Sequence, residues 1–263
     1  MKEIVLGIAA HPDDLEFMAG GTIAKFCKEG KEVYFLITTN GQRGSLQPDA
    51  EPKTIISTRE AEARAAAGVL GVKDIIFLGY EDGFLDRTPH LELREKFIFY
   101  IRKLKPRIVM TFDPWNQYEQ HSDHRKVALA AFESCYFSHY PLFHPEFKLA
   151  KHFVSEIWLF RSPTPNTWIS LNNKEIRTKV KAIIKHASQV QMLKEEIFGQ
   201  LEAEAIDYSL IEQVDNKSLV DIFVRGMMEE AGKIKDYKFA EAFKVVTIGY
   251  VEDVKRILNA LQS

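Results

Sequence analysis

The sequence predicts an α/β fold in which helices cover a mainly parallel sheet. Short runs of apolar and β-branched residues alternate with longer segments of helical apolar spacing. Alternation of this kind is typical of strand-helix-strand units, whose strands run parallel. The chain has 263 residues, of which 46% are hydrophobic, so it can form a large buried core. No internal repeat, low-complexity tract or Gly/Ser-rich linker divides it.

The expected elements follow one another closely. Residues 4–10 form an apolar strand, and the helical spacing that follows ends at Gly30, a residue type that often terminates helices. Residues 55–70 are rich in alanine and also have helical spacing. Further helices are expected at residues 97–104 and 127–135, and further strands at residues 33–39, 74–78, 108–112, 154–160 and 167–171.

The C-terminal part has a different pattern. From Lys174 onward the spacing is mostly helical, with an irregular break near residues 209–217. We therefore expect a single domain over residues 1–263, with a Rossmann-like α/β core at residues 1–190 and a helical C-terminal extension at residues 191–263 packed on it. The expected architecture is a three-layer sandwich with a mainly parallel sheet and a helical C-terminal region.

Composition excludes several classes of protein. The 35 Lys and Arg residues are balanced by 37 Asp and Glu residues, which gives no electrostatic basis for binding nucleic acid or an anionic membrane. Two cysteines are too few for a disulfide framework. The apolar segment near the N-terminus is too short for a signal peptide, and no run approaches the roughly 18 apolar residues of a membrane helix. These features predict a cytoplasmic protein.

Side chains that can bind a metal follow two of the expected strands. The run His-Pro-Asp-Asp at residues 11–14 follows the first strand, and the run His-Ser-Asp-His at residues 121–124 lies beyond the fourth. Ligands gather at the carboxyl ends of parallel strands, and zinc in catalytic sites takes imidazole and carboxylate ligands while leaving one position open. His11, Asp14 and His124 offer this donor set, and we predict that they hold one divalent metal ion per chain.

Each of these features also has a structural interpretation. A histidine at the end of a strand is often a surface or hydrogen-bonded residue, and Asp13 and Asp14 could cap a helix. Their occurrence at the ends of two strands that should lie side by side favours a metal site.

The same residues resemble a known family. Residues 10–16, followed by Gly20-Gly21-Thr22, and residues 121–124 together resemble the PIG-L/LmbE-like superfamily of zinc-dependent N-acetylglucosaminyl deacetylases. The resemblance covers about residues 1–190. It implies that His11, Asp14 and His124 bind zinc and that Asp13 is the general base.

The resemblance assigns further roles in the second motif. It implies that His121, oriented by Asp123, stabilises the tetrahedral intermediate or protonates the leaving amine. The chemistry supports this division of labour, because zinc polarises an amide carbonyl and activates water, while an amine leaving group still needs a proton. Asp123 beside the imidazole is expected to favour the charged form of His121.

Substrate contacts are expected from three residues. Arg59 matches the position at which relatives carry a substrate-binding arginine, although its segment could also be the exposed face of a helix. Residues 113–119 resemble the branch of the family that deacetylates chitin-derived disaccharides, and the rings of Trp115 and Tyr118 could stack on a pyranose. Trp115 could instead be a core anchor. For His186, a structural role and a role behind the site are both open.

These observations predict a zinc-dependent hydrolase that removes the acetyl group from a small sugar containing N-acetylglucosamine, such as N,N'-diacetylchitobiose or an N-acetylglucosamine conjugate. The expected partner is this amino-sugar substrate, with no nucleic acid or membrane, and the resemblance implies a homo-oligomer. A non-catalytic metal- and sugar-binding protein of the same fold remains the alternative. A dinucleotide-binding oxidoreductase is excluded because no Gly-x-Gly-x-x-Gly follows the first strand. The chain also has no His-Glu-x-x-His helix motif and no Gly-x-Ser-x-Gly motif.

Overall fold

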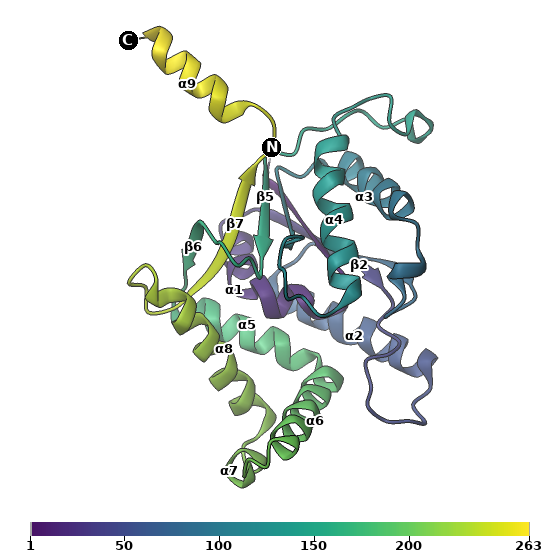
Figure 1. Ribbon diagram of the computed structural model, residues 1–263, viewed down its shortest axis with the longest axis vertical. Coiled ribbons are helices and arrows are strands. Elements are labelled where there is room, and N and C mark those ends of the chain that lie inside the picture. The colour runs from purple at the N-terminus through teal and green to yellow at the C-terminus, as the bar shows by residue number, and fades with distance from the viewer. Residues whose placement is uncertain (1, 263) are drawn as a thin grey trace.

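The computed structural model describes residues 2–262, in which one sheet has the strand order β3-β2-β1-β4-β5-β7-β6 (Figure 1). Strands β1 to β5 are parallel, whereas β7 runs antiparallel to both β5 and β6. The prediction of a mainly parallel sheet is therefore confirmed. The strands are β1 (Ile4–Ala9), β2 (Glu32–Thr39), β3 (Asp74–Tyr80), β4 (Ile108–Phe112), β5 (Glu156–Phe160), β6 (Thr167–Ser170) and β7 (Ala240–Thr247).

Helices cover both faces of the sheet and complete the expected three-layer arrangement. One layer contains α3 and α4, which pack on each other, and the opposite layer contains α1 and α2. Helix α5 packs against α1 and α2, and α8 packs against α5 (Figure 1). The helices are α1 (Asp14–Lys28), α2 (Pro52–Leu70), α3 (His90–Leu104), α4 (Ser122–Phe137), α5 (Asn173–Lys185), α6 (Ala187–Ala203), α7 (Ser209–Glu212), α8 (Asn216–Lys233) and α9 (Val251–Gln262), with short 3-10 turns at Leu85–Arg87 and Pro145–Phe147.

Local sequence explains where several elements begin and end. Helix α2 has Pro52 in its first turn, where a missing N–H costs nothing, and it ends at Gly71 in the left-handed conformation. Helix α5 begins with a capping box between Asn172 and Glu175. The central strands β1 and β4 are apolar and buried along nearly all their length, as expected for strands covered on both faces.

Strand β7 is the main difference from the sequence-based expectation. It lies inside the segment expected to form a helical extension, and the β-branched run Val245-Val246-Thr247 was the available signal. Its Glu241 carboxylate accepts the backbone N–H groups of Gly21 and Thr22 in α1 and lies 2.6 Å from the Lys179 ammonium group of α5. The C-terminal part of the chain is thus built into the sheet as well as packed on it.

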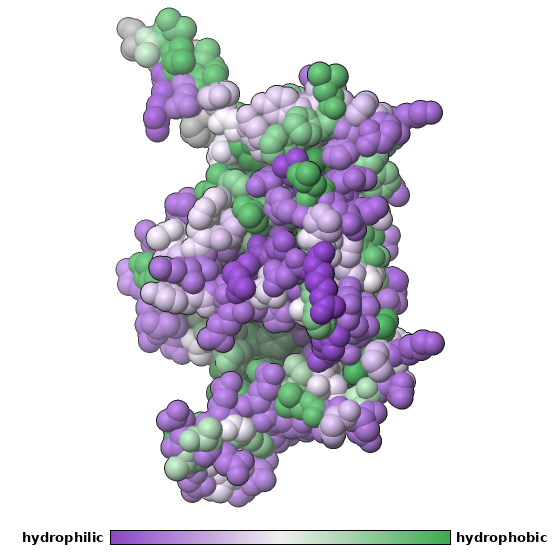
Figure 2. All heavy atoms as spheres, turned by 45° about the vertical axis from the view of Figure 1, so that its right-hand side comes forward, coloured by the Kyte–Doolittle hydropathy of each residue, from purple (hydrophilic) through white to green (hydrophobic). Residues whose placement is uncertain are grey.

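Helix α9 extends away from the rest of the molecule (Figure 1). Its apolar side chains, among them Val254, Ile257 and Leu261, are exposed, and Figure 2 shows the projecting segment with both apolar and hydrophilic sides. Among the described residues 2–262, no helix has the length and apolar character needed to cross a membrane.

Candidate active site

The two sequence motifs meet beyond the carboxyl ends of the parallel strands. Strands β1 and β4 are neighbours, and the chain continues from β1 to β2 and β3 on one side and from β4 to β5 on the other. A crevice forms beyond the carboxyl ends of strands at such a switch point. His11 follows β1 and His124 lies in the first turn of α4, and the Nδ1 atom of His11 is 3.2 Å from the Nε2 atom of His124. The expectation that both loops share one site is confirmed.

Asp14 completes a set of three donors. Its Oδ1 atom lies 3.3 Å from His124 Nε2, and its Oδ2 atom lies 3.5 Å from His11 Nδ1. Ligands at zinc distances of about 2.1 Å in a tetrahedron are roughly 3.4 Å apart. The separations of His124 Nε2 from Asp14 Oδ1 and from His11 Nδ1, 3.3 and 3.2 Å, fit ligands of a single small cation. The backbone N–H groups of Ala10 and His11 donate to Asp14 Oδ2 at 3.1 and 2.8 Å, which fixes the carboxylate in place.

The helix-cap interpretation of this motif is wrong. Asp13 occupies the N-cap position of α1, but its side chain makes no capping hydrogen bond. Its backbone has φ 128°, a strained conformation for a residue other than glycine, and such strain is often found at functional sites.

Carboxylates lie behind both histidines, on the sides that face away from the other donors. The Nε2 atom of His11 is 3.0 Å from Asp82 Oδ1, and the Nδ1 atom of His124 is 3.2 Å from Glu119 Oε1. Histidines that bind metals usually donate their other ring N–H to a carboxylate or carbonyl, which sets the tautomer and orients the ring. The arrangement therefore supports His11 and His124 as ligands.

Roles for Asp82 and Glu119 were not expected from the sequence. Asp82 lies just beyond the carboxyl end of β3, and Glu119 lies in the loop before the second motif. Their positions after strand ends were the only signal in the sequence. The carboxylates of Asp14 and Glu119, which oppose the effect of burial, raise the pKa of His124 to about 9. The charge of His124 in turn outweighs burial and lowers the pKa of Glu119 to about 2.

Asp123 does not orient His121 through its carboxylate, contrary to the expectation. The carboxylate accepts the backbone N–H groups of Gly83 and Leu85 at 2.7 and 3.1 Å, and its Oδ2 atom lies 3.4 Å from His11 Nε2. It is the backbone N–H of Asp123 that donates to His121 Nδ1, at 3.2 Å. Asp123 therefore supports His11, and His121 forms the N-cap of α4.

Asp123 favours the charged form of His121, as expected, but other effects outweigh it. Burial lowers the pKa of His121, and the positive charges of His11 and His124 lower it further, although Asp123 and Asp14 raise it. Because Nδ1 accepts a hydrogen bond, the proton of the neutral ring is on Nε2. One ring nitrogen from each of His11, His121 and His124 lies within 4.8 Å of the other two, so His121 is directly beside the donor set.

Asp13 has the properties of a general base. Burial, together with the charge of Asp14, raises its pKa to about 6, while the Arg59 guanidinium at 3.4 Å opposes this rise. A carboxylate with such a pKa is still ionised at neutral pH and is a stronger proton acceptor than an ordinary aspartate.

Comparisons with known proteins agree with this geometry. Residues 6–135 match the family model described as PIG-L, GlcNAc-PI de-N-acetylase. A diacetylchitobiose deacetylase of Thermococcus kodakarensis is 32% identical over 188 residues, which are 70% of this chain and 69% of the relative. The chain belongs to the PIG-L family. The family resemblance drawn from the two motifs is therefore confirmed.

Other similar proteins match over different lengths. A probable N-acetyl-alpha-D-glucosaminyl L-malate deacetylase of Bacillus anthracis is 30% identical over 133 residues, which are 49% of this chain and 58% of the relative. The structure of N,N'-diacetylchitobiose deacetylase from Pyrococcus horikoshii in complex with an inhibitor has a TM-score of 0.78 at 28% identity. The structural match covers 96% of this chain and 88% of the Pyrococcus horikoshii chain.

In this PIG-L chain, Arg59 is buried and is not part of an exposed helix face. Its guanidinium donates to the backbone carbonyls of Gly41 and Pro12 at 3.0 and 2.9 Å, and only 3% of the residue is exposed. It ties the loop after β2 to the loop that carries Asp13. Its contact with substrate stays a prediction.

The two aromatic residues have different positions. Tyr118 is 83% exposed and lines a hollow together with His121 and His124. Trp115 is 58% exposed and packs edge-to-face on Phe132, so it is not a core anchor. Trp115 is not among the described residues that line the hollows around the donor set, so the structure brings only Tyr118 to the site.

His186 lies behind the site. It is fully buried, and its Nε2 atom is 3.4 Å from the Glu16 carboxylate of α1. Burial lowers the pKa of His186, but Glu16 and Asp13 outweigh this effect and raise it. These contacts favour a role behind Asp13 over a role on an exposed helix face.

Proposed function

We propose that this PIG-L chain is a zinc-dependent N-deacetylase that removes the acetyl group from a small sugar containing N-acetylglucosamine. The observation that supports it best is the donor set of His11, Asp14 and His124, in which both histidines have a carboxylate on their other ring nitrogen. Two imidazoles and one carboxylate are a typical catalytic zinc set, which leaves a position for substrate or water.

The metal has a defined part in the proposal. His11, Asp14 and His124 hold one Zn²⁺ per chain, and when bound it polarises the amide carbonyl and makes water more acidic. The closed coordination of a purely structural zinc site would need a fourth protein ligand.

Asp13 moves the protons in this proposal. It accepts a proton from the attacking water, for which its raised pKa of about 6 is well matched. The same carboxyl then passes the proton to the nitrogen of the leaving amine. A purely structural metal site has no use for an additional carboxylate beside its ligands, which counts against the alternative function.

His121 stabilises developing charge in this proposal. Its Nδ1 atom accepts the backbone N–H of Asp123, which leaves Nε2–H as a donor, and His121 lines the hollow that contains His11, Asp13 and Asp14. A neutral imidazole fixed in this way donates to the oxygen that becomes negative in the tetrahedral intermediate. Of the two roles considered for His121, the structure thus favours stabilisation of the intermediate over proton donation.

The substrate class follows from the relatives and from the hollow at the site. The similar proteins act on acetylated glucosamine attached to a sugar or to malate. The exposed ring of Tyr118 at the rim can stack on the apolar face of a pyranose. Substrate contacts by Arg59 and Trp115, a cytoplasmic location and a homo-oligomeric state remain predictions.

One experiment tests the function. Metal content is measured by elemental analysis for the wild type and for His124→Ala, and free-amine release is measured from N-acetylglucosamine and N,N'-diacetylchitobiose with and without a chelator. We expect one zinc per chain, loss of zinc in the variant and chelator-sensitive turnover. Undiminished metal in His124→Ala would overturn the ligand set. Bound zinc without turnover of either sugar would support the non-catalytic alternative.

A further inference from the structure

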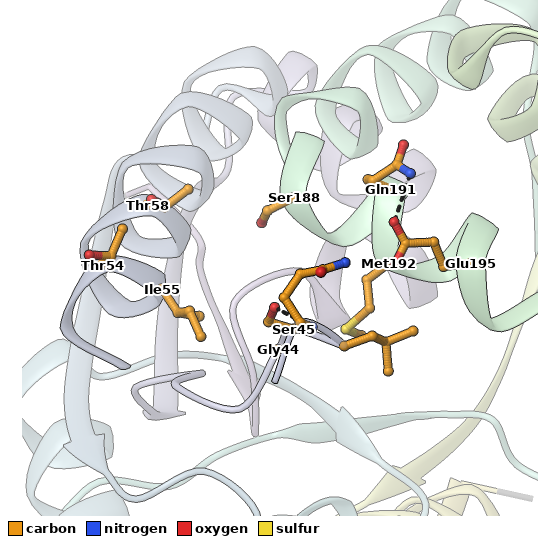
Figure 3. Close-up of a pocket in the computed structure, with 11 residues that line it drawn as sticks. Gly44, Ser45, Thr54, Ile55, Thr58, Ser188, Gln191, Met192 and Glu195 are labelled. Carbon is orange, nitrogen blue, oxygen red and sulfur yellow. Dashed lines mark hydrogen bonds between the residues drawn. The ribbon is translucent and has the colours of Figure 1, made fainter. Parts of the chain in front are cut away.

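A second hollow adjoins the candidate active site. It has a volume of about 270 Å³ and lies between α2 and the first turns of α6, with the loop of Gly44 and Ser45 crossing between them (Figure 3). Gly44, Leu46 and Met192 line both this hollow and the one that contains His11, Asp13 and Asp14. A substrate with its acetamide at the donor set can therefore extend past these residues. We call this second hollow the side pocket.

The side pocket combines apolar surface with neutral polar groups. Leu46 supplies an apolar side chain. Ile55 and Met192 supply two more, and Thr54 and Thr58 supply hydroxyl groups (Figure 3). A pyranose or cyclitol ring needs this combination, because its C–H face is apolar and its hydroxyl groups need hydrogen-bond partners.

The only charged side chain among the described residues that line the side pocket is Glu195 of α6. It is half-buried, and its Oε1 atom accepts a hydrogen bond from the Gln191 amide at 2.9 Å. This partner is neutral and leaves the negative charge uncompensated.

The arginines of the neighbouring hollow have partners of their own. Arg43 lies 2.8 Å from the Glu81 carboxylate and donates to the backbone carbonyl of Asp82. Arg59 donates to two backbone carbonyls and lies beside Asp13. The side pocket therefore presents negative charge to whatever enters it.

We propose that Glu195 is a specificity-determining residue, which makes the side pocket accept a neutral, polyhydroxylated aglycone ring and reject an aglycone that carries a carboxylate or phosphate. The proposal rests on the proposed function, because it concerns the part of the substrate attached to the acetylated glucosamine. Like charges in a partly desolvated pocket repel one another more strongly than in water, so a single carboxylate can discriminate by charge.

Four probes separate charge from size. N-acetylglucosamine alone carries no aglycone to occupy the side pocket, N,N'-diacetylchitobiose adds a neutral ring, and N-acetylglucosaminyl malate adds two carboxylates. The dimethyl ester of the malate conjugate has nearly the same shape without the charge. We expect the ester and the disaccharide to have at least tenfold higher kcat/KM than the malate conjugate.

Variants then assign the effect to the side pocket. We expect Glu195→Gln to reduce the preference for the ester over the malate conjugate several-fold, and Glu195→Lys to reverse it. Glu202→Lys, further along α6, is the matched charge control and should leave the preference unchanged. Thr58→Trp should lower kcat/KM for the disaccharide about tenfold, whereas Ser57→Trp, outside the lining, should not. The two control substitutions, Glu202→Lys and Ser57→Trp, should leave kcat/KM for N-acetylglucosamine within twofold.

The outcomes distinguish this proposal from the proposed function. An unchanged ester preference in Glu195→Lys, or an unaffected disaccharide in Thr58→Trp, would overturn the role of the side pocket while deacetylation itself stands. If no probe is hydrolysed, the proposed function fails, and equilibrium binding of the same probes measures the same preferences. Absence of a charge preference in binding would then overturn the role of Glu195 as well.

Discussion

Metal binding should displace protons from the histidines of the site. In the metal-free protein, Asp14 and Glu119 outweigh the effect of burial and raise the pKa of His124 to about 9, so at pH 7 this imidazole is almost fully protonated. Burial also lowers the pKa of His11, but the carboxylates of Asp123, Asp14 and Asp82 raise it well above its usual value. A ring nitrogen must lose its proton before it can bind zinc. Each ion bound at pH 7 should therefore release at least one proton.

The size of the effect follows from the same pKa. Deprotonating a group whose pKa lies about two units above the pH costs roughly 2.7 kcal/mol. This cost raises the dissociation constant for zinc about a hundredfold. Protons and zinc compete for the same ring nitrogens of the folded protein, so raising the pH favours zinc binding. Zinc affinity should therefore rise about tenfold for each pH unit between pH 6 and 8, and more steeply where His11 loses a proton too.

Calorimetric titration with Zn²⁺ measures this release. The observed enthalpy is compared in two buffers of different ionisation enthalpy at pH 7, and the slope gives the number of protons released. His121→Phe is the control, because His121 is placed outside the ligand set and its substitution should leave the proton count unchanged. A release close to zero, or an affinity that is flat from pH 6 to 8, would show that His124 is not a protonated ligand and would refute the assignment.

Three further predictions concern catalysis and stability. Asp13→Asn should keep the zinc and the fold but lose about a hundredfold to ten-thousandfold in kcat, because it removes the general base; steady-state rates check this, and wild-type turnover would rule out the role. In the wild type, kcat/KM should fall about tenfold per pH unit below pH 6, because only ionised Asp13 accepts a proton; a profile flat down to pH 5 would contradict it. Lys179→Met leaves the Glu241 carboxylate buried without its cation and should lower the free energy of unfolding in urea by about 3–5 kcal/mol. The exposed Lys181→Met on the same helix should change the unfolding free energy by less than about 0.5 kcal/mol, and equal effects of the two would show that the buried pair is not important.

The sequence by itself determines the order of strands and helices in the α/β part. Hydrophobic periodicity is a local signal, and it located β1 to β6 to within a few residues. The two motifs at residues 11–14 and 121–124 were also recognisable, because metal-binding side chains occur together at the ends of two strands that should lie side by side. The family and the candidate ligands followed from these two local signals.

Tertiary structure decided which group each side chain contacts. The Asp123 carboxylate contacts His11 and not the nearby His121, because the first turn of α4 directs it toward the loops after β1 and β3. Asp82 reaches His11 only because β3 is parallel to β1 in the same sheet, so that the carboxyl ends of both strands lie on the same side. Spacing along the chain carries no information about such contacts, which depend on how strands far apart in sequence are ordered in the sheet.

Strand β7 and Arg59 also depend on contacts that spacing along the chain does not reveal. A short β-branched run near the end of a mostly helical segment becomes a strand because β5 and β6 leave a place between them, and its Glu241 finds partners in α1 and α5. Arg59 has the sequence context of an exposed helical residue, yet it is buried, because the loops around Pro12 and Gly41 close over it. Local sequence determined the elements, and long-range packing determined the contacts that position the chemistry.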